Sequence, residues 1–65
     1  MMKTIVRCRN DMVLVFGQDE KQIPEYQGQY QEVKQNILTD APPGAVFAHG
    51  FDRYGGLNKV DREEW

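Results

Sequence analysis

A single cysteine, Cys8, most constrains how this 65-residue chain can hold a fold together. One cysteine forms no internal disulfide, and the sequence has no Cys-x-x-Cys pair of the kind that anchors structural zinc. A single core in a chain this short rarely supplies more than about 3 to 5 kcal/mol of net stability. We therefore expect residues 1–65 to form one small domain that depends on packing or on association with a partner.

Apolar residues occur in short runs rather than in one long segment. The longest run is Met12 to Phe16, far below the roughly 20 residues that span a bilayer. Lys3 and Arg7 interrupt the amino-terminal segment, where a secretory signal would be continuously apolar. We therefore expect a soluble cytoplasmic protein that does not bind membranes.

Residues 3–16 show the alternation of a β-hairpin. Polar and β-branched side chains alternate over residues 3–9, and a run of apolar residues occupies 12–16. Between them, Asn10-Asp11 tolerates the positive φ angles of a tight turn. The pattern predicts two antiparallel strands joined by a two-residue turn.

The length of this turn decides which side chains share a face of the hairpin. A two-residue turn pairs Arg7 with Leu14 and Ile5 with Phe16. We therefore expect one small apolar face that packs in the core and a second face that combines apolar residues with cations. The first face comprises Thr4, Val6, Cys8, Val13 and Val15, and the second comprises Lys3, Ile5, Arg7, Arg9, Met12, Leu14 and Phe16.

Residues 24–39 have the apolar spacing of an α-helix. Pro24 suits the first helical turn, and Pro42-Pro43 prevents the helix from continuing. Gly28, within this range, costs roughly 1 kcal/mol relative to alanine in a helix. The large apolar side chains recur mostly three or four positions apart, at Tyr26, Tyr30, Val33, Ile37 and Leu38.

The last third of the chain predicts two further strands, over residues 45–51 and 57–60, joined by a glycine-rich turn. Asp61 has the position of a helix N-cap, and Trp65 is placed to fill the edge of the core. In the first of these strands we expect the helix to pack on the small residues Val46, Ala48 and Gly50, and we expect Phe47, His49 and Phe51 to lie on the opposite face.

The order β-β-α-β-β predicts a two-layer α+β domain, with one helix packed on a mostly antiparallel four-stranded sheet. Such a sheet has a second face that the single helix does not cover. Either the carboxy-terminal segment around Trp65 covers this second face, or the face is exposed.

An exposed stripe formed by Met12, Leu14 and Phe16 would mark an interaction surface, with the stems of Arg7 and Arg9 at its rim. Our leading hypothesis is a noncatalytic protein-interaction module, either a homodimer or a domain that docks on a larger protein through this hairpin face. We expect it to need no cofactor and to be no enzyme.

Nucleic-acid binding is the first alternative. Lys3, Arg7 and Arg9 alternate along one strand, and cations beside aromatic side chains bind single-stranded nucleic acid. A net charge of −2 at pH 7 opposes this hypothesis, because nonspecific phosphate binding grows with the number of basic contacts.

A small ligand-binding protein or enzyme is the second alternative. His49 and Cys8 are each unique and are the one pair that could supply a base and a nucleophilic thiol. The glycines of residues 50–56 could let the backbone approach a ligand. The candidate ligand-binding residues are His49, Asp52, Arg53 and Tyr54; no spacing of histidine, cysteine and acidic residues predicts a metal site.

Overall fold

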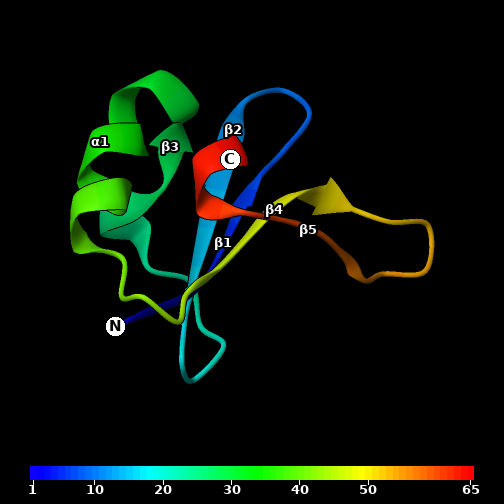
Figure 1. Cartoon of the computed structure of the whole chain (residues 1–65), viewed down its shortest axis with the longest axis horizontal. Coiled ribbons are helices and arrows are strands. Elements are labelled where there is room, and N and C mark those ends of the chain that lie inside the picture. Colours follow the sequence, from blue (N-terminus) through cyan, green and yellow to red (C-terminus); the bar gives the residue numbers. More distant parts are fainter.

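A five-stranded mixed sheet with one α-helix on one side forms the domain (Figure 1). The structure is a computed structural model that describes residues 1–65. The predicted α+β class is confirmed, although the sheet has five strands and includes a parallel pair. The elements are β1 (Met2–Arg7), β2 (Met12–Gly17), the 3-10 turn η1 (Pro24–Tyr26), β3 (Gly28–Gln29), α1 (Tyr30–Asp40), β4 (Val46–Phe51), β5 (Leu57–Val60) and the 3-10 turn η2 (Arg62–Glu64).

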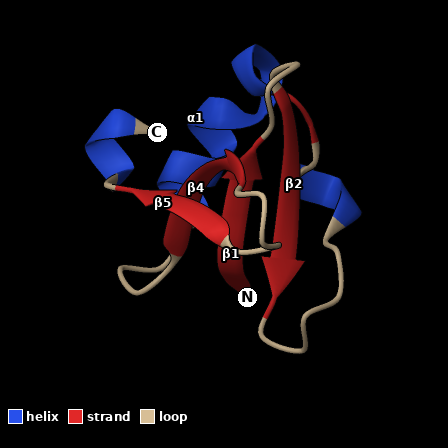
Figure 2. Cartoon of the chain, turned by 90° about the vertical axis from the view of Figure 1, so that its right-hand side faces the viewer, coloured by secondary structure: helices blue, strands red, loops and turns tan.

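The strands lie in the order β3-β2-β1-β4-β5, so the first strand of the chain is the central strand of the sheet (Figure 2). β1 pairs with β2 antiparallel and with β4 parallel, and β5 pairs antiparallel with β4. Parallel neighbours need a long crossover connection, which here contains α1. The parallel pairing brings the carboxyl ends of β1 and β4 together at one edge of the sheet.

The turn of the first hairpin has three residues, not the predicted two, and the predicted register is therefore wrong. The N–H of Asp11 donates to the carbonyl of Cys8 at 2.9 Å, and the N–H of Cys8 donates to the carbonyl of Met12 at 2.7 Å. Asp11 has a φ of 63° and is the left-handed residue that closes a three-residue hairpin loop. Val6 consequently pairs with Leu14, and Arg7 pairs with Val13.

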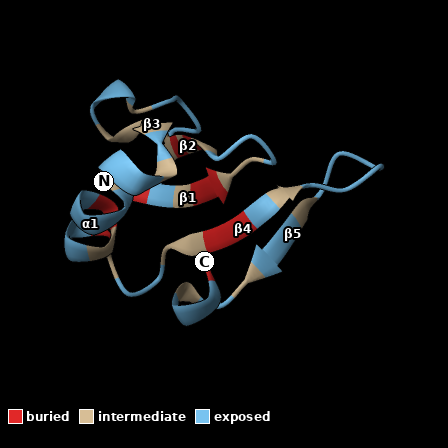
Figure 3. Ribbon diagram, turned by 90° about the horizontal axis from the view of Figure 1, so that it is seen from above, coloured by how far each residue is buried: buried red, intermediate tan, exposed pale blue.

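This shift of one residue changes the predicted core. Ile5, Val13 and Val15 face α1, whereas Val6 and Ala48 lie on the opposite face of the sheet. The prediction that α1 packs on Val46, Ala48 and Gly50 was therefore wrong. The buried cluster that joins the sheet to the helix comprises Met2, Ile5, Val13, Val15, Ile37, Ala41, Phe47 and Trp65 (Figure 3).

The helix begins at Tyr30, six residues after the predicted start at position 24. Gly28 has a φ of 150°, which is outside the helical region and is rarely adopted by other residues. The segment before the helix instead lies along the outer edge of β2, where the Val15 N–H donates to Oε1 of Gln27 at 3.1 Å. Polar groups of this segment therefore form hydrogen bonds with backbone groups at the edge of β2.

The segment after β5 closes one end of the core, as predicted for Trp65. The indole is 3% exposed and contacts the rings of Tyr30 and Phe47 edge to face, with centroid distances of 5.1 Å in both pairs. Nη2 of Arg62 donates to the carbonyl of Pro42 at 2.7 Å and so attaches η2 to the loop before β4. Asp61 is at the N-cap position of η2, as predicted, although its side chain makes no capping hydrogen bond.

Candidate binding surface

The face of the sheet opposite α1 carries a group of apolar residues from four strands, and we call it the open face. Val6 lies at its centre on β1, between Leu14 of β2 and Ala48 of β4. Both Val6 and Ala48 are fully buried, so the larger residues around them shield them from solvent. The apolar residues of the open face that are accessible to a partner include Met12, Leu14, Phe16, Phe51 and Leu57.

A hollow of about 280 Å³ lies at one end of the open face, and we call it the apolar hollow. Its apolar walls are Val6, Phe16, Phe51 and Leu57, and Lys3 and Glu20 line it with one charge of each sign. Leu14 and Phe16 therefore lie on the helix-free side, as predicted. Phe51 is 51% exposed, the largest exposed fraction of any apolar residue within a strand.

Phe51 lies on the open face because β4 contains an irregularity that breaks its regular alternation. The register between β4 and β5 shifts between Ala48 and Phe51, and Gly50 has a φ of 76°. A bulge of this kind turns the following side chain to the other face of the strand. The prediction that Phe51 shares a face with Phe47 was therefore wrong. Gly50, a glycine within a strand, is the sequence signal for such a bulge.

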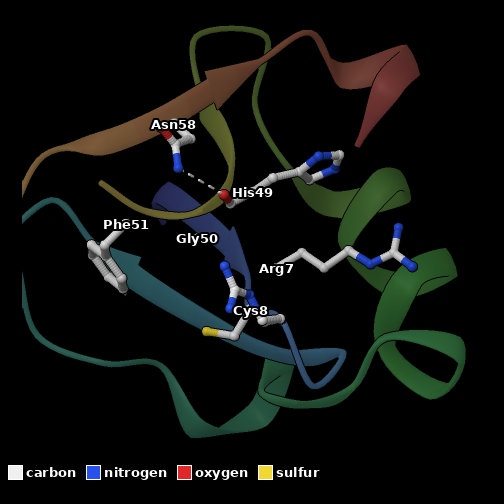
Figure 4. Close-up of a pocket in the computed structure, with 7 residues that line it drawn as sticks. Arg7, Cys8, His49, Gly50, Phe51 and Asn58 are labelled. Atoms are coloured by element: carbon white, nitrogen blue, oxygen red, sulfur yellow. Dashed lines mark hydrogen bonds between the residues drawn. The ribbon is translucent and has the colours of Figure 1, made fainter. Parts of the chain in front are cut away.

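A second, polar hollow of about 540 Å³ lies at the carboxyl ends of β1 and β4 (Figure 4). We call it the cationic hollow, because two arginines line it and no acidic residue does. The parallel pairing of β1 with β4 places these residues together, since Arg7 is the neighbour of His49 in the register. The lining residues are Arg7, Cys8, Arg9, His49, Gly50, Phe51 and Asn58.

The two arginines of this hollow have different surroundings. Arg7 stacks over the ring of Tyr30 at 3.6 Å, donates from Nε to Oδ1 of Asp11 at 3.0 Å and from Nη1 to the backbone oxygen of Trp65 at 3.1 Å. The Arg7–Asp11 contact is the single ion pair of the chain. Arg9 is exposed in the turn and has no acidic partner, so its guanidinium is free to bind an anion.

The predicted row of cations on one strand face does not form. Arg7 points toward Tyr30 on the helix side of the sheet, whereas Lys3 lines the apolar hollow on the other side. The pairing of β1 with β2 is irregular between Met2 and Thr4, at Lys3, and the side chains of Lys3 and Arg7 are on opposite faces of the sheet. Arg9 lies outside the strand. The nucleic-acid hypothesis built on these three cations therefore loses its geometric basis.

His49 and Cys8 line the same hollow but make no contact that would activate a thiol. No hydrogen bond joins them, and their side chains point in different directions in Figure 4. Nε2 of His49 instead lies 3.3 Å from the backbone oxygen of Trp65. The geometry therefore provides no base for a Cys8 nucleophile.

The other candidate ligand-binding residues, in the loop between β4 and β5, do not converge. Oδ1 of Asp52 accepts hydrogen bonds from the backbone N–H groups of Tyr54 and Gly56, both at 2.8 Å, so this carboxylate shapes the loop. Tyr54 is 87% exposed, and Arg53 is exposed beside it. Of the four residues proposed from the sequence, His49 alone lines a hollow.

Comparison with family models, with curated proteins and with solved structures finds no match to this chain. No helix of the structure is long and apolar enough to cross a membrane. No three side chains of histidine, cysteine, aspartate or glutamate are grouped so that they could hold a metal ion. The protein is thus a small α+β domain with one helix-free sheet face and two hollows that share the side chain of Phe51.

Proposed function

We propose that this protein is a noncatalytic protein-interaction module whose contact surface is the open face of the sheet. The observation that supports the proposal most directly is the position of Phe51, a half-exposed aromatic side chain beside Phe16 and Leu57. Apolar side chains grouped on one face of a soluble domain mark an interaction surface. A partner that covers Phe51 removes its apolar surface from water and gains about 25 cal/mol for each Å² buried.

The charges at the rim favour a different protein over a second copy as the partner. Lys3 and Arg9 line the two hollows, and Lys59 pairs with Ala48 and so lies on the same face of the sheet. Glu20 is the one acidic residue that lines either of these hollows. Two copies stacked through this face would bring these cations together, whereas a partner with an acidic rim would complement them.

Phe51→Asp tests the proposal with Tyr54→Asp as its matched control, because each variant puts the same charge at an exposed aromatic position. Tyr54 lines neither hollow. Peptides selected from a random display library on the parent chain should bind Phe51→Asp at least about tenfold more weakly and Tyr54→Asp unchanged, since burial of a Phe side chain is worth about 1.5 to 3 kcal/mol.

Circular dichroism of both variants should match the parent spectrum, because neither side chain belongs to the core. Selected peptides that bind Phe51→Asp as tightly as the parent would refute the proposed surface. If light scattering showed that the parent is a dimer and that Phe51→Asp dissociates it, the partner would be a second copy of this chain and not a different protein.

We further propose a cytoplasmic location, where the free thiol of Cys8 would remain reduced.

A further inference from the structure

The apolar hollow and the cationic hollow share one wall, the side chain of Phe51. A ligand that lies across Phe51 therefore contacts both. On one side it meets Phe16 and Leu57, and on the other it meets Arg9 and Asn58. From this arrangement we propose that the module binds an extended peptide segment in which an apolar side chain lies close in sequence to an acidic side chain. This inference rests on the proposed function, since it names the partner chemistry of that surface.

The size and lining of the apolar hollow fit one apolar side chain of a peptide. Its volume of about 280 Å³ is slightly below the roughly 300 to 1,000 Å³ typical of small-molecule sites. The rings of Phe16 and Phe51 and the methyl groups of Leu57 offer dispersion contacts. Phe51 also separates this contact from the charged side, so the two parts of a ligand meet different chemistry.

The cationic hollow fits a carboxylate. Arg9 carries a guanidinium without an acidic partner, and a guanidinium binds a carboxylate through two parallel hydrogen bonds. Nδ2 of Asn58 lies in the same hollow, where it donates to the backbone carbonyl of His49 at 3.3 Å (Figure 4). No acidic residue lines this hollow, so an incoming carboxylate meets no like charge there.

A peptide satisfies both hollows better than a strand of nucleic acid. Each nucleotide carries a phosphate, and a strand across Phe51 would place phosphates on both sides of it, including the side that Glu20 lines. The chain also has a net charge of −2 at pH 7. A peptide places its acidic group at one end of the contact and an uncharged side chain at the other, in agreement with the observed lining.

The test uses the full chain and an array of fluorescently labelled peptides, capped at both ends, that vary the spacing between one leucine and one glutamate. At the best spacing, replacing leucine by alanine should weaken binding about tenfold, because the side chain loses its burial in the apolar hollow. Replacing glutamate by glutamine should weaken binding about two- to fivefold, because Arg9 is exposed and an exposed ion pair contributes little. Arg9→Gln should remove the preference for glutamate over glutamine. Arg53→Gln, an exposed arginine outside both hollows, should keep it.

The outcomes separate this inference from the proposed function. Peptides that need Phe51 but bind equally with glutamate or glutamine would overturn the inference and leave the interaction surface intact. Binding that is indifferent to Phe51→Asp would overturn both. Tighter binding of a labelled single-stranded oligonucleotide, weakening steeply as salt is added, would overturn the peptide assignment in favour of nucleic acid. Arg9 and Phe51 lie outside the core cluster, so their variants should fold, and circular dichroism checks this.

Discussion

Removal of the Trp65 side chain should unfold the domain. The indole is 3% exposed and lies edge to face against Tyr30 and Phe47, so Trp65→Ala loses one of the larger contacts of the core. Truncation of a buried aromatic residue to alanine costs about 3 to 5 kcal/mol. This equals the net stability that a core of this size supplies, so the variant should be largely unfolded without denaturant at 25 °C.

A second substitution at this position separates packing from polarity. Nε1 of Trp65 is buried and has no hydrogen-bond partner, and an unsatisfied buried donor costs about 1 to 3 kcal/mol. Trp65→Phe keeps an aromatic ring between Tyr30 and Phe47 and removes this donor. Removing the unsatisfied donor regains part of the free energy that is lost with the smaller ring. We therefore expect Trp65→Phe to be folded, with a free energy of unfolding within about 1.5 kcal/mol of the parent.

Urea denaturation followed by far-ultraviolet circular dichroism measures both variants without tryptophan fluorescence, which each of them lacks. The parent and Trp65→Phe should give parallel transitions with similar slopes, and Trp65→Ala should show little folded baseline. A Trp65→Ala protein that lost less than about 1 kcal/mol would refute the assignment of Trp65 as a core residue. A Trp65→Phe protein as unfolded as Trp65→Ala would refute the account of the unpaired donor.

The hairpin turn and one tyrosine give two further predictions. Asp11→Asn should be nearly neutral, because asparagine tolerates the φ of 63° and the exposed pair with Arg7 is worth little, whereas Asp11→Val should lower stability by about 1 to 2 kcal/mol more. Equal urea midpoints for the two variants would contradict the three-residue turn. The hydrogen bond from Tyr26 to Asp40, at 2.6 Å, raises the pKa of Tyr26 above 10.0 because it favours the protonated phenol. Its stabilising contribution is therefore complete below pH 10 and lost as the pH rises through the folded-state pKa. Ultraviolet titration compared with Tyr26→Phe should show this phenolate forming above pH 10, and Asp40→Asn should reduce the shift in the Tyr26 pKa, since desolvation and Glu25 still raise it.

The positions of the main strands and the antiparallel pairing of the first hairpin could be predicted from the sequence, but the register of that hairpin and the parallel pairing of β1 with β4 could not. Alternation over residues 3–16 and the small residues of β4 indicated strands correctly. The turn did not reveal its own length, because Asn10-Asp11 fits a two-residue turn as well as the last two positions of a three-residue turn. Since side chains alternate with a period of two, that one residue made Leu14 the partner of Val6 instead of Arg7 and changed which residues of β1 share a face with the core residues of β2.

The candidate site shows the same limit. Leu14 and Phe16 could be placed on the helix-free face from the pattern of one strand. Phe51 could not, because its face depends on the bulge at Gly50, which breaks the alternation of β4. The cationic hollow depends on the parallel pairing of β1 with β4, a contact between distant segments that local periodicity does not encode.

The bond between Arg7 and Trp65 joins residues 58 positions apart and has a consequence for synthesis of the protein. β1 leaves the ribosome before its neighbour β4 and before Trp65, whose backbone oxygen binds Arg7. Contacts between distant segments form slowly, because the intervening chain must be ordered first. Until those contacts form, Ile5, Val13 and Val15 of the first hairpin are exposed to solvent. We therefore expect the domain to complete its folding only after Trp65 has been synthesised.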